Sequence, residues 1–275
     1  MLPFKEIQPD TRISCRSIFL SDWHLGARAA NPATILSVLR NLKAQNIYLV
    51  GDILDIWHGG RVHWSAEADE ILSELRRMAR AGAHITYLPG NHDAPMRSGA
   101  EAPHGGWKIT NELIHETADG RRFLVIHGDQ CDSRLFRQHF MTRLGSRLDS
   151  SLRWLDNIYR KKFALERGQQ TPFEWIISKS NELMSTGYVF DHRALSLATA
   201  VGADGVICGH SHKPAMREWD GKLFANCGDW VDGMTGLVER FDGTLELLDF
   251  SPVAHAVWAA THAPEEAEAL AEVIG

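Results

Sequence analysis

The chain has 275 residues, of which 44% are hydrophobic and 23% charged, so it can bury a large core in one or two domains. Its formal net charge of −6 excludes binding to nucleic acid by bulk electrostatic attraction, and no stable nucleic-acid partner is expected. Four cysteines, without Cys-x-x-Cys spacing or a preceding secretion signal, predict reduced thiols in a cytoplasmic protein. No apolar run approaches the roughly 18 residues of a membrane-spanning helix, which leaves only peripheral membrane attachment open.

Five short apolar runs predict buried strands, and each run ends in side chains that can bind metal. The runs are residues 17–20, 47–50, 85–89, 123–126 and 206–208. Asn, His and Asp are also ordinary turn residues, so one such motif alone is weak evidence, but five in one chain would rarely arise by chance. The side chains that follow the runs are Asp22, His24, Asp52, Asp55, Asn91, His92, His127, His210 and His212.

Two amphipathic helices separate the first three predicted strands. The first begins with Asn31 as N-cap and Pro32 at the first helical position, and its apolar stripe follows the helical period: Ile35, Val38, Leu39 and Leu42. The second covers about residues 66–81. Strand–helix alternation predicts a sheet with right-handed crossovers, in which ligands bind at the carboxyl ends of the strands.

Three later pairs of strand-like segments are joined by Asp-Gly turns, which favour hairpins. They are residues 112–117 with 122–126, 217–219 with 223–225, and 236–240 with 244–250. The first pair predicts a mixed sheet, and the two later pairs predict a second sheet packed on the first. From residue 255 onward the composition predicts a terminal helix or a frayed tail.

Residues 130–200 break this rhythm and predict a helical insertion over the site, within a single domain that spans residues 1–275. Between Asp132 and Gln170, nine Lys or Arg stand against four Asp or Glu, a local net charge of +5, beside an apolar stripe from Phe136 to Phe163. A solvated helix face would explain this pattern, and so would a surface that contacts anionic lipid headgroups.

The candidate ligands carry a prediction about chemistry. Seven donors are too many for one ion and suit two ions that share a carboxylate: Asp22, His24, Asp52, Asn91, His127, His210 and His212. Imidazole and oxygen donors without thiolate fit Mn²⁺, Fe or Zn²⁺ better than a structural zinc site. Two metal ions about 3.5–4 Å apart can hold a phosphoryl group and supply hydroxide for in-line attack. The ligand count therefore predicts metal-assisted hydrolysis of a phosphoester.

The motifs Asp-x-His, Gly-Asp-x-x-Asp, Gly-Asn-His-Asp, His-Gly-Asp and Gly-His-x-His, in this order, resemble the calcineurin-like metallophosphoesterases over residues 17 to about 250. The resemblance implies an α/β fold, a four-layer αββα sandwich of two mixed sheets with a helical insertion. It also implies two divalent ions, Mn²⁺ first, with Asp52 bridging them. One ion would have Asp22, His24 and His212 as its other ligands, and the second would have Asn91, His127 and His210. His92 would face the leaving-group oxygen and be oriented by Asp55.

Residues 21–26, 51–57 and 226–231 are similar to the UDP-2,3-diacylglucosamine hydrolases and their broader relatives. That branch cleaves the pyrophosphate of a nucleotide-linked lipid in lipid A synthesis. The resemblance therefore implies a hydrolase of a phosphodiester or pyrophosphate bond, peripheral to the inner membrane on its cytoplasmic side. At two positions the chain instead follows the wider family, because His92 and Asp55 stand where that branch typically carries Arg and Glu.

Two other functions compete with this one. A soluble phosphodiesterase or nuclease that acts on nucleotides would use the same metal site. A scaffold that binds partners without catalysis could share the fold, but such scaffolds usually lose metal ligands, and this sequence keeps all seven.

Overall fold

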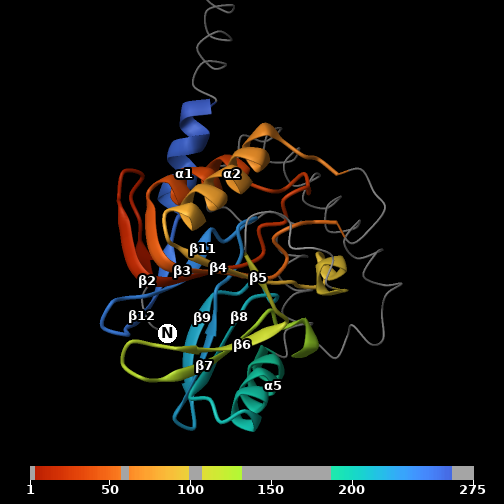
Figure 1. Ribbon diagram of the computed structural model, residues 1–275, viewed down its shortest axis with the longest axis vertical. Coiled ribbons are helices and arrows are strands. Elements are labelled where there is room, and N and C mark those ends of the chain that lie inside the picture. The colour runs from red at the N-terminus through yellow and green to blue at the C-terminus, as the bar shows by residue number, and fades with distance from the viewer. Residues whose placement is uncertain (1–3, 57–61, 99–106, 132–186, 262–275) are drawn as a thin grey trace, which may run out of the picture. The chain divides into compact units, whose positions relative to one another are not determined.

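The computed structural model describes residues 4–56, 62–98, 107–131 and 187–261 (Figure 1). The chain forms two units: residues 1–129 together with 194–275, and residues 130–193. The second unit covers most of the predicted insertion. Residues 132–186, with the predicted basic and apolar stripe, lie outside the described residues.

The larger sheet has seven strands and contains the first three predicted strands as parallel neighbours, β2, β3 and β4. β11 pairs antiparallel with both β2 and β12, so the sheet is mixed. Its strands, in order across the sheet, are β1 (Lys5–Glu6), β12 (Leu245–Asp249), β11 (Thr235–Glu239), β2 (Ile13–Leu20), β3 (Leu42–Val50), β4 (His84–Leu88) and β5 (Lys108–Ile109).

The smaller sheet has five strands, and its three central strands, β7, β8 and β10, run parallel. Each edge strand pairs antiparallel with its neighbour. The strands, in order, are β6 (Glu112–Glu116), β7 (Arg122–Ile126), β8 (Gly205–Cys208), β10 (Lys222–Asn226) and β9 (Ala215–Trp219). The α/β architecture with two mixed sheets is therefore confirmed.

All three predicted hairpins form, as β6–β7, β9–β10 and β11–β12. The prediction that the last two hairpins both build the second sheet is wrong, because β11–β12 joins the larger sheet. The reason is that every residue of β11 is buried. Leu237 packs between the sheets while Val238 packs on the opposite face, an environment that only a central strand provides.

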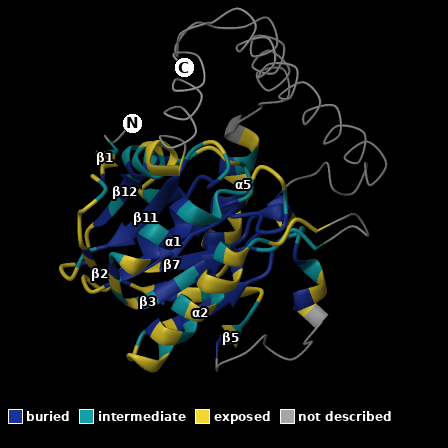
Figure 2. Cartoon of the chain, turned by 90° about the horizontal axis from the view of Figure 1, so that it is seen from above, coloured by how far each residue is buried: buried dark blue, intermediate teal, exposed yellow. Residues whose placement is uncertain are grey.

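Successive residues of the central strand β2 supply two separate cores, as the period of a strand requires. Ile18 and Leu20 pack with the helices, whereas Phe19 packs between the sheets with residues of the smaller sheet such as Phe123 and Ile207. Figure 2 shows both sheets as largely buried. The part of α5 (Gly187–Ala200) that belongs to the first unit lies, in Figure 1, on the side of the smaller sheet away from α1 and α2, which completes four layers.

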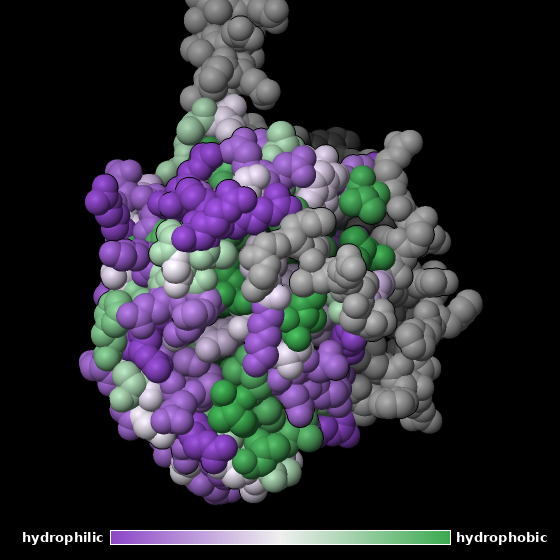
Figure 3. Space-filling model, viewed as in Figure 1, coloured by the Kyte–Doolittle hydropathy of each residue, from purple (hydrophilic) through white to green (hydrophobic). Residues whose placement is uncertain are grey.

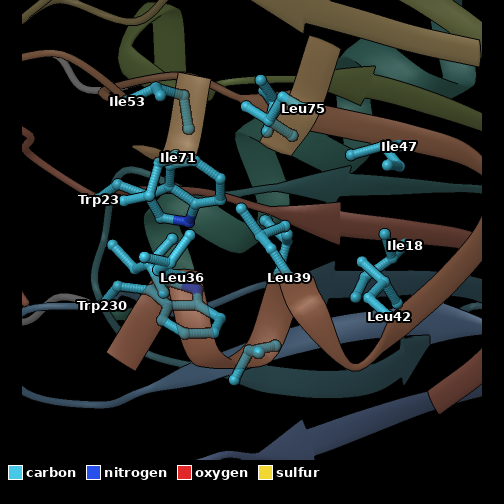
Figure 4. Packing of buried hydrophobic residues seen from close by; sticks show 14 of the residues in the cluster. Ile18, Trp23, Leu36, Leu39, Leu42, Ile47, Ile53, Ile71, Leu75 and Trp230 are labelled. Carbon is cyan, nitrogen blue, oxygen red and sulfur yellow. The ribbon is translucent and has the colours of Figure 1, made fainter. Parts of the chain in front are cut away.

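Helices α1 (Pro32–Arg40) and α2 (Ala66–Arg80) turn their apolar stripes toward the larger sheet. Figure 4 shows Leu36 and Leu39 of α1, Ile71 and Leu75 of α2, and both Trp23 and Trp230 in one apolar cluster. Each such side chain contributes roughly 1.5–3 kcal/mol by leaving water. The outward side chains of α2 are exposed and charged, which agrees with the hydrophilic surface over this helix in Figure 3: Asp69, Glu70, Arg77 and Arg80. A further helix, residues 251–261, agrees with the prediction of a terminal helix.

Two details of α1 differ from the prediction. The helix ends at Arg40, and Leu42 begins β3, where it pairs with Ile13. Asn31 occupies the N-cap position without a capping hydrogen bond. Its amide instead donates to the backbone carbonyls of Trp230 and Val231, at 3.0 and 3.1 Å, so it fastens the start of α1 to the loop before β11.

A buried carboxylate, Glu239 of β11, connects the two sheets and is fully hydrogen-bonded. Burial would raise its pKa, but donors from both sheets surround it and lower the pKa to about 2. The hydroxyl of Tyr48 extends this group by a 2.9 Å contact with Nδ1 of His115. The four donors, with their distances to the Glu239 oxygens, are Arg16 Nη1 (2.6 Å), Ser17 Oγ (2.6 Å), Ala118 N (2.8 Å) and His115 Nε2 (2.9 Å). We call these six residues the Glu239 network.

Candidate metal centre

The predicted site residues follow the carboxyl ends of five strands, all within the first unit: β2, β3 and β4 of the larger sheet, and β7 and β8 of the smaller. We call them the strand-end site, and they are Asp22, His24, Asp52, Asp55, Asn91, His92, His127, His210 and His212. Eight of these residues form three groups, two of which share His24, and in each group the potential ligand atoms lie within 4.8 Å of one another. The groups are Asp22–His24–His212, Asp52–His127–His210 and His24–Asp55–His92.

The backbone of the site is strained. Five candidate ligands have a positive φ, in the left-handed region that costs a residue other than glycine of order 1–3 kcal/mol. Among the other described non-glycine residues, only Asp220 and Met234 share this conformation. Strained backbone of this kind is concentrated at functional sites, where the surrounding structure holds it in place. The five φ values are 56° for Asp22, 50° for His24, 52° for Asp52, 65° for His210 and 54° for His212.

Two glycines allow the ligand loops to approach one another. A Cβ at Gly51, whose φ is +82°, would lie 2.2 Å from Nδ1 of His127. A Cβ at Gly90 would lie 2.3 Å from Oδ1 of Asp52. Both distances are far below contact, so these positions bring loops from β3, β4 and β7 together only because they lack side chains.

Three buried atoms of the candidate ligands make no hydrogen bond: Oδ1 of Asp22, Oδ1 of Asn91 and Nε2 of His127. Leaving a buried polar atom unsatisfied costs about 1–3 kcal/mol. The nearest charged atoms are other members of the site, since Nε2 of His127 lies 3.3 Å from Oδ2 of Asp52. Carboxylate, amide oxygen and imidazole are lone-pair donors, so the residues present fit divalent metal ions.

Three imidazoles of the site each have a partner at Nδ1, the ring nitrogen that points away from the other ligands. Nδ1 of His127 lies 2.9 Å from the carbonyl oxygen of Val50. Nδ1 of His92 lies 2.9 Å from Oδ1 of Asp55, the pairing that the sequence predicts. Nδ1 of His212 lies 3.3 Å from Oδ2 of Asp229. In each case the outer partner leaves Nε2 to point into the site, as in metal centres of known geometry.

Asp93 supports the loop that carries Asp52. Its buried carboxylate accepts hydrogen bonds from backbone amides of the loops after β3 and β4 and from the hydroxyl of Tyr87. Burial raises the pKa of Asp93, and the nearby charge of Asp52 raises it further. The amide donors are Gly90, Asp52, Ile53 and Leu54. The sequence could not distinguish a turn residue from a supporting group here, and it gave no sign of the part played by Tyr87.

A second support joins the loops after β4 and β7. Nη2 of Arg97 lies 2.8 Å from each carboxylate oxygen of Asp129, and the same side chain donates to the carbonyl oxygen of Pro89. Asn91 and His127 are on the two loops that this ion pair connects. No sequence pattern pointed to Arg97, because it lies in a short 3₁₀ segment, Ala94–Ser98, outside every strand-end motif.

The pKa values of the candidate histidine ligands are shifted in opposite directions. Burial lowers the pKa of His24 to about 4, which keeps this imidazole neutral and able to bind metal. Burial also opposes the charge on His127, but Asp52 outweighs it and raises the pKa of His127 to about 10. Burial would raise the pKa of Asp52, yet His127 holds it far below its ordinary value, so Asp52 stays ionised. For His212, Asp22 and Asp229 outweigh burial and raise the pKa well above 6.5.

Burial alone would lower the pKa of His92, but the hydrogen bond with Asp55 and the charges of Asp52, Asp55 and Asp22 raise it above its ordinary value. Bound cations would counter the contributions of Asp52 and Asp22. The Asp55 contact would remain, and the imidazole stands edge-to-face with His24 at 4.6 Å between ring centroids. His92 is therefore a protonatable group at the edge of the ligand set.

Fold and site together define an α/β sandwich with side chains at the strand ends that could hold divalent metal ions. The family model described as calcineurin-like phosphoesterase matches residues 15–214, and the chain belongs to this family. Family membership makes the chain a phosphoesterase, which argues against the scaffold that binds without catalysis.

Relatives of known name agree with this class. The UDP-2,3-diacylglucosamine hydrolase of Xanthomonas campestris pv. campestris (strain B100) is 25% identical over 248 residues, which cover 82% of this chain and 95% of the relative. The protein of the same name from Neisseria meningitidis serogroup B is 24% identical and covers 82% and 93%. Among solved structures, an archaeal phosphodiesterase aligns with 85% of this chain at 13% identity and a TM-score of 0.41, too loosely to bear on function.

Proposed function

We propose that the strand-end site binds two divalent ions, with Mn²⁺ ahead of Fe and Zn²⁺, and that Asp52 bridges them. Asp22, His24 and His212 would hold one ion, and Asn91, His127 and His210 the other. The observation that carries this proposal is the set of three buried donor atoms without hydrogen bonds, on Asp22, Asn91 and His127. When bound, two such ions polarise the phosphoryl oxygens and activate water for in-line attack.

In this proposal the protein's own acid is His92. Its Nδ1 is engaged by Asp55 at 2.9 Å, which fixes the tautomer and directs Nε2 toward the oxygen that leaves phosphorus. Asp55 would stabilise the charged imidazolium, so the proton remains available at neutral pH. After donating it, His92 recovers a proton from solvent, which its partial exposure allows.

We infer that the substrate contains a phosphodiester or pyrophosphate bond, with UDP-2,3-diacylglucosamine or a related nucleotide-linked lipid as the first candidate. The names of the two bacterial relatives support this inference, because the match to this chain extends over 95% and 93% of their length. Such an enzyme would work in the cytoplasm, peripheral to the inner membrane and in contact with anionic lipid. Within the described residues, no helix is both long and apolar enough to cross a membrane.

A soluble phosphodiesterase that acts on nucleotides is the second candidate. The His92–Asp55 pair favours it: the two side chains are in contact at 2.9 Å, and the sequence resemblance assigns this pair to the wider family of metallophosphoesterases. The diacylglucosamine branch would carry Arg and Glu at these positions. Arg cannot give up its proton in a protein, so the two arrangements suit different leaving groups.

The discriminating experiment compares three substrates with protein loaded separately with Mn²⁺, Fe²⁺ and Zn²⁺. The substrates are UDP-2,3-diacylglucosamine, a cyclic nucleotide and an aryl phosphodiester. Preference for the nucleotide-linked lipid in kcat/KM supports the first candidate, and preference for the cyclic nucleotide supports the second. Failure of all three with every metal would contradict the proposed hydrolysis.

A second experiment tests the membrane contact through residues that lie outside the described part of the chain. Reversing the charge of Arg160, Lys161 and Lys162 together should weaken binding to anionic vesicles by well over tenfold, since each basic residue near a bilayer contributes about 1 kcal/mol. The KM for a lipid-linked substrate should rise, whereas a small soluble ester should be hydrolysed as before. Absent or salt-insensitive vesicle binding by the unmodified protein would favour the soluble enzyme.

A further inference from the structure

The loop between β10 and β11, residues 227–234, supplies no candidate ligand but contacts the strand-end site at two points. The backbone amide of Trp230 donates to the carbonyl oxygen of Asp22 at 3.1 Å. The carboxylate of Asp229, which is 1% exposed, faces His212. The loop therefore lies against one of the two proposed ion positions, the one made by Asp22, His24 and His212.

Asp229 contacts the nitrogen of His212 that points away from the site. Oδ2 of Asp229 lies 3.3 Å from Nδ1 of His212. The opposite nitrogen, Nε2, lies 3.1 Å from Oδ1 of Asp22 and 3.4 Å from Nε2 of His24. The His212 side chain is 40% exposed and its backbone is left-handed, so packing alone constrains this ring less than it constrains the buried ring of His127.

The Asp229 carboxylate is itself held in place. Oδ1 accepts from the amide of Gly233 at 2.8 Å, and Oδ2 accepts from the amide of Asp232 at 3.1 Å. A Cβ at Gly233 would lie only 2.4 Å from Oδ1 of Asp229, so the turn closes tightly around the carboxylate. A fixed carboxylate behind an imidazole is the arrangement that orients metal-binding histidines and makes them better donors.

We propose that Asp229 is a positioning residue that orients His212 and thereby sets the affinity of one metal position and not the other. The proposal rests on the two-ion site proposed above. The asymmetry follows from the partners: His212 depends on a side chain, whereas His127 of the other group contacts the backbone carbonyl oxygen of Val50. Removing the Asp229 charge should therefore weaken one of two binding steps.

Calorimetric titration of metal-free protein with Mn²⁺, and with Co²⁺ followed by visible absorption, measures both steps without any substrate. The unmodified protein should bind two ions. Asp229→Asn should weaken one step by about 10–100-fold, the usual effect of losing an outer partner, and leave the other step within about twofold. The Co²⁺ band of the weakened position should shift. Asp220→Asn, the same change on an exposed turn, is the matched control and should leave both steps intact.

A double-mutant cycle separates positioning from a general loss of structure. In a His212→Ala background, Asp229→Asn should have almost no further effect on metal binding, because the residue it positions is gone. If Asp229→Asn fails to fold, Gly233→Ala replaces it: the added Cβ displaces the carboxylate without removing its charge, and the same step should weaken.

The outcomes are distinguishable. If the unmodified protein binds fewer than two ions, the proposed metal centre fails and the role of Asp229 fails with it. If two ions bind but Asp229→Asn affects neither step or both equally, the centre stands and the positioning role is overturned. Full additivity in the His212→Ala background would also overturn it.

Discussion

The strand-end site and the Glu239 network both bury carboxylates and imidazoles between strands, yet they treat polar atoms in opposite ways. In the Glu239 network four donors surround the two oxygens of one carboxylate. In the strand-end site three buried ligand atoms make no hydrogen bond of standard geometry, although two of them lie 3.1 and 3.3 Å from a charged group of the same site, and five residues take a left-handed backbone. The hydrogen bonds of the Glu239 network are complete within the protein, whereas the polar atoms of the strand-end site need a bound ligand.

This difference shows how a buried charge can be assigned to structure or to function. A fully paired carboxylate holds elements together and carries a penalty when one partner is removed. A cluster of buried polar side chains with incomplete hydrogen bonding, on strained backbone, lowers the stability of the chain. Such a cluster indicates a binding site, because a bound ligand would satisfy its polar atoms.

Replacing Asp52 with Ala should abolish metal binding at both positions and reduce turnover by more than the 10²–10³-fold that a single electrostatic donor contributes. The reason is that one carboxylate serves both ions. Metal content and kcat/KM measure this directly, with Asp242→Asn, an exposed turn carboxylate, as the control. Two tightly bound ions in Asp52→Ala would contradict the bridging role.

Replacing His92 with Ala should lower kcat by about 10²–10⁴-fold, the usual contribution of a general acid, while both ions remain bound. The deficit should shrink for an aryl ester, whose leaving group needs no proton. The measurement is kcat on esters with good and poor leaving groups. An equal deficit on both would exclude the acid role and leave His92 as a substrate-positioning group.

Replacing Glu239 with Gln should leave metal content and kcat unchanged but destabilise the fold by about 3 kcal/mol at pH 7. Because folding lowers the pKa of Glu239 to about 2, its contribution is complete above its unfolded pKa near 4.5 and fades as the pH falls toward 2. Urea unfolding at pH 7 and pH 3 should therefore show a difference between wild type and variant that is smaller at pH 3. A difference that grows in acid would have the wrong sign for this account.

Loading the metal should release about two protons per chain at pH 7, because metal binding requires neutral imidazoles. In the metal-free protein the pKa of His127 is about 10 and that of His212 lies well above 6.5, so both start charged. His24, with a pKa of about 4, starts neutral. Overall loading should therefore weaken as the pH falls below 7. Calorimetry in two buffers of different ionisation enthalpy counts the protons, and no release would contradict the ligand assignment.

Much of the strand-end site could be predicted from sequence because its signals are local. Each ligand motif directly follows a run such as Ile47–Val50, and parallel strands bring their carboxyl ends to one edge. The position of β11 could not be predicted, since pairing of Leu237 with Phe19 joins residues more than two hundred positions apart. Leu42 continued the helical period of α1, yet its pairing with Ile13 placed it in β3.

The residues that support the ligands could not be predicted either, because their contacts also join residues that are distant in the sequence. Asp93 and Asp229 sit in turns, where Asp is common whatever its partners, and only the folded chain shows which donors reach them. Arg97 and Tyr87 lie outside every motif. The Glu239 network was also hidden from the sequence, because its partners come from strands of both sheets.

The most direct test of the central claim is anomalous diffraction from crystals grown with Mn²⁺. We predict two peaks about 3.5–4 Å apart, both in contact with Asp52. One should be bound by Asp22, His24 and His212, and the other by Asn91, His127 and His210. A single peak, or peaks that leave the unpaired atoms of Asp22, Asn91 and His127 without a ligand, would contradict the account.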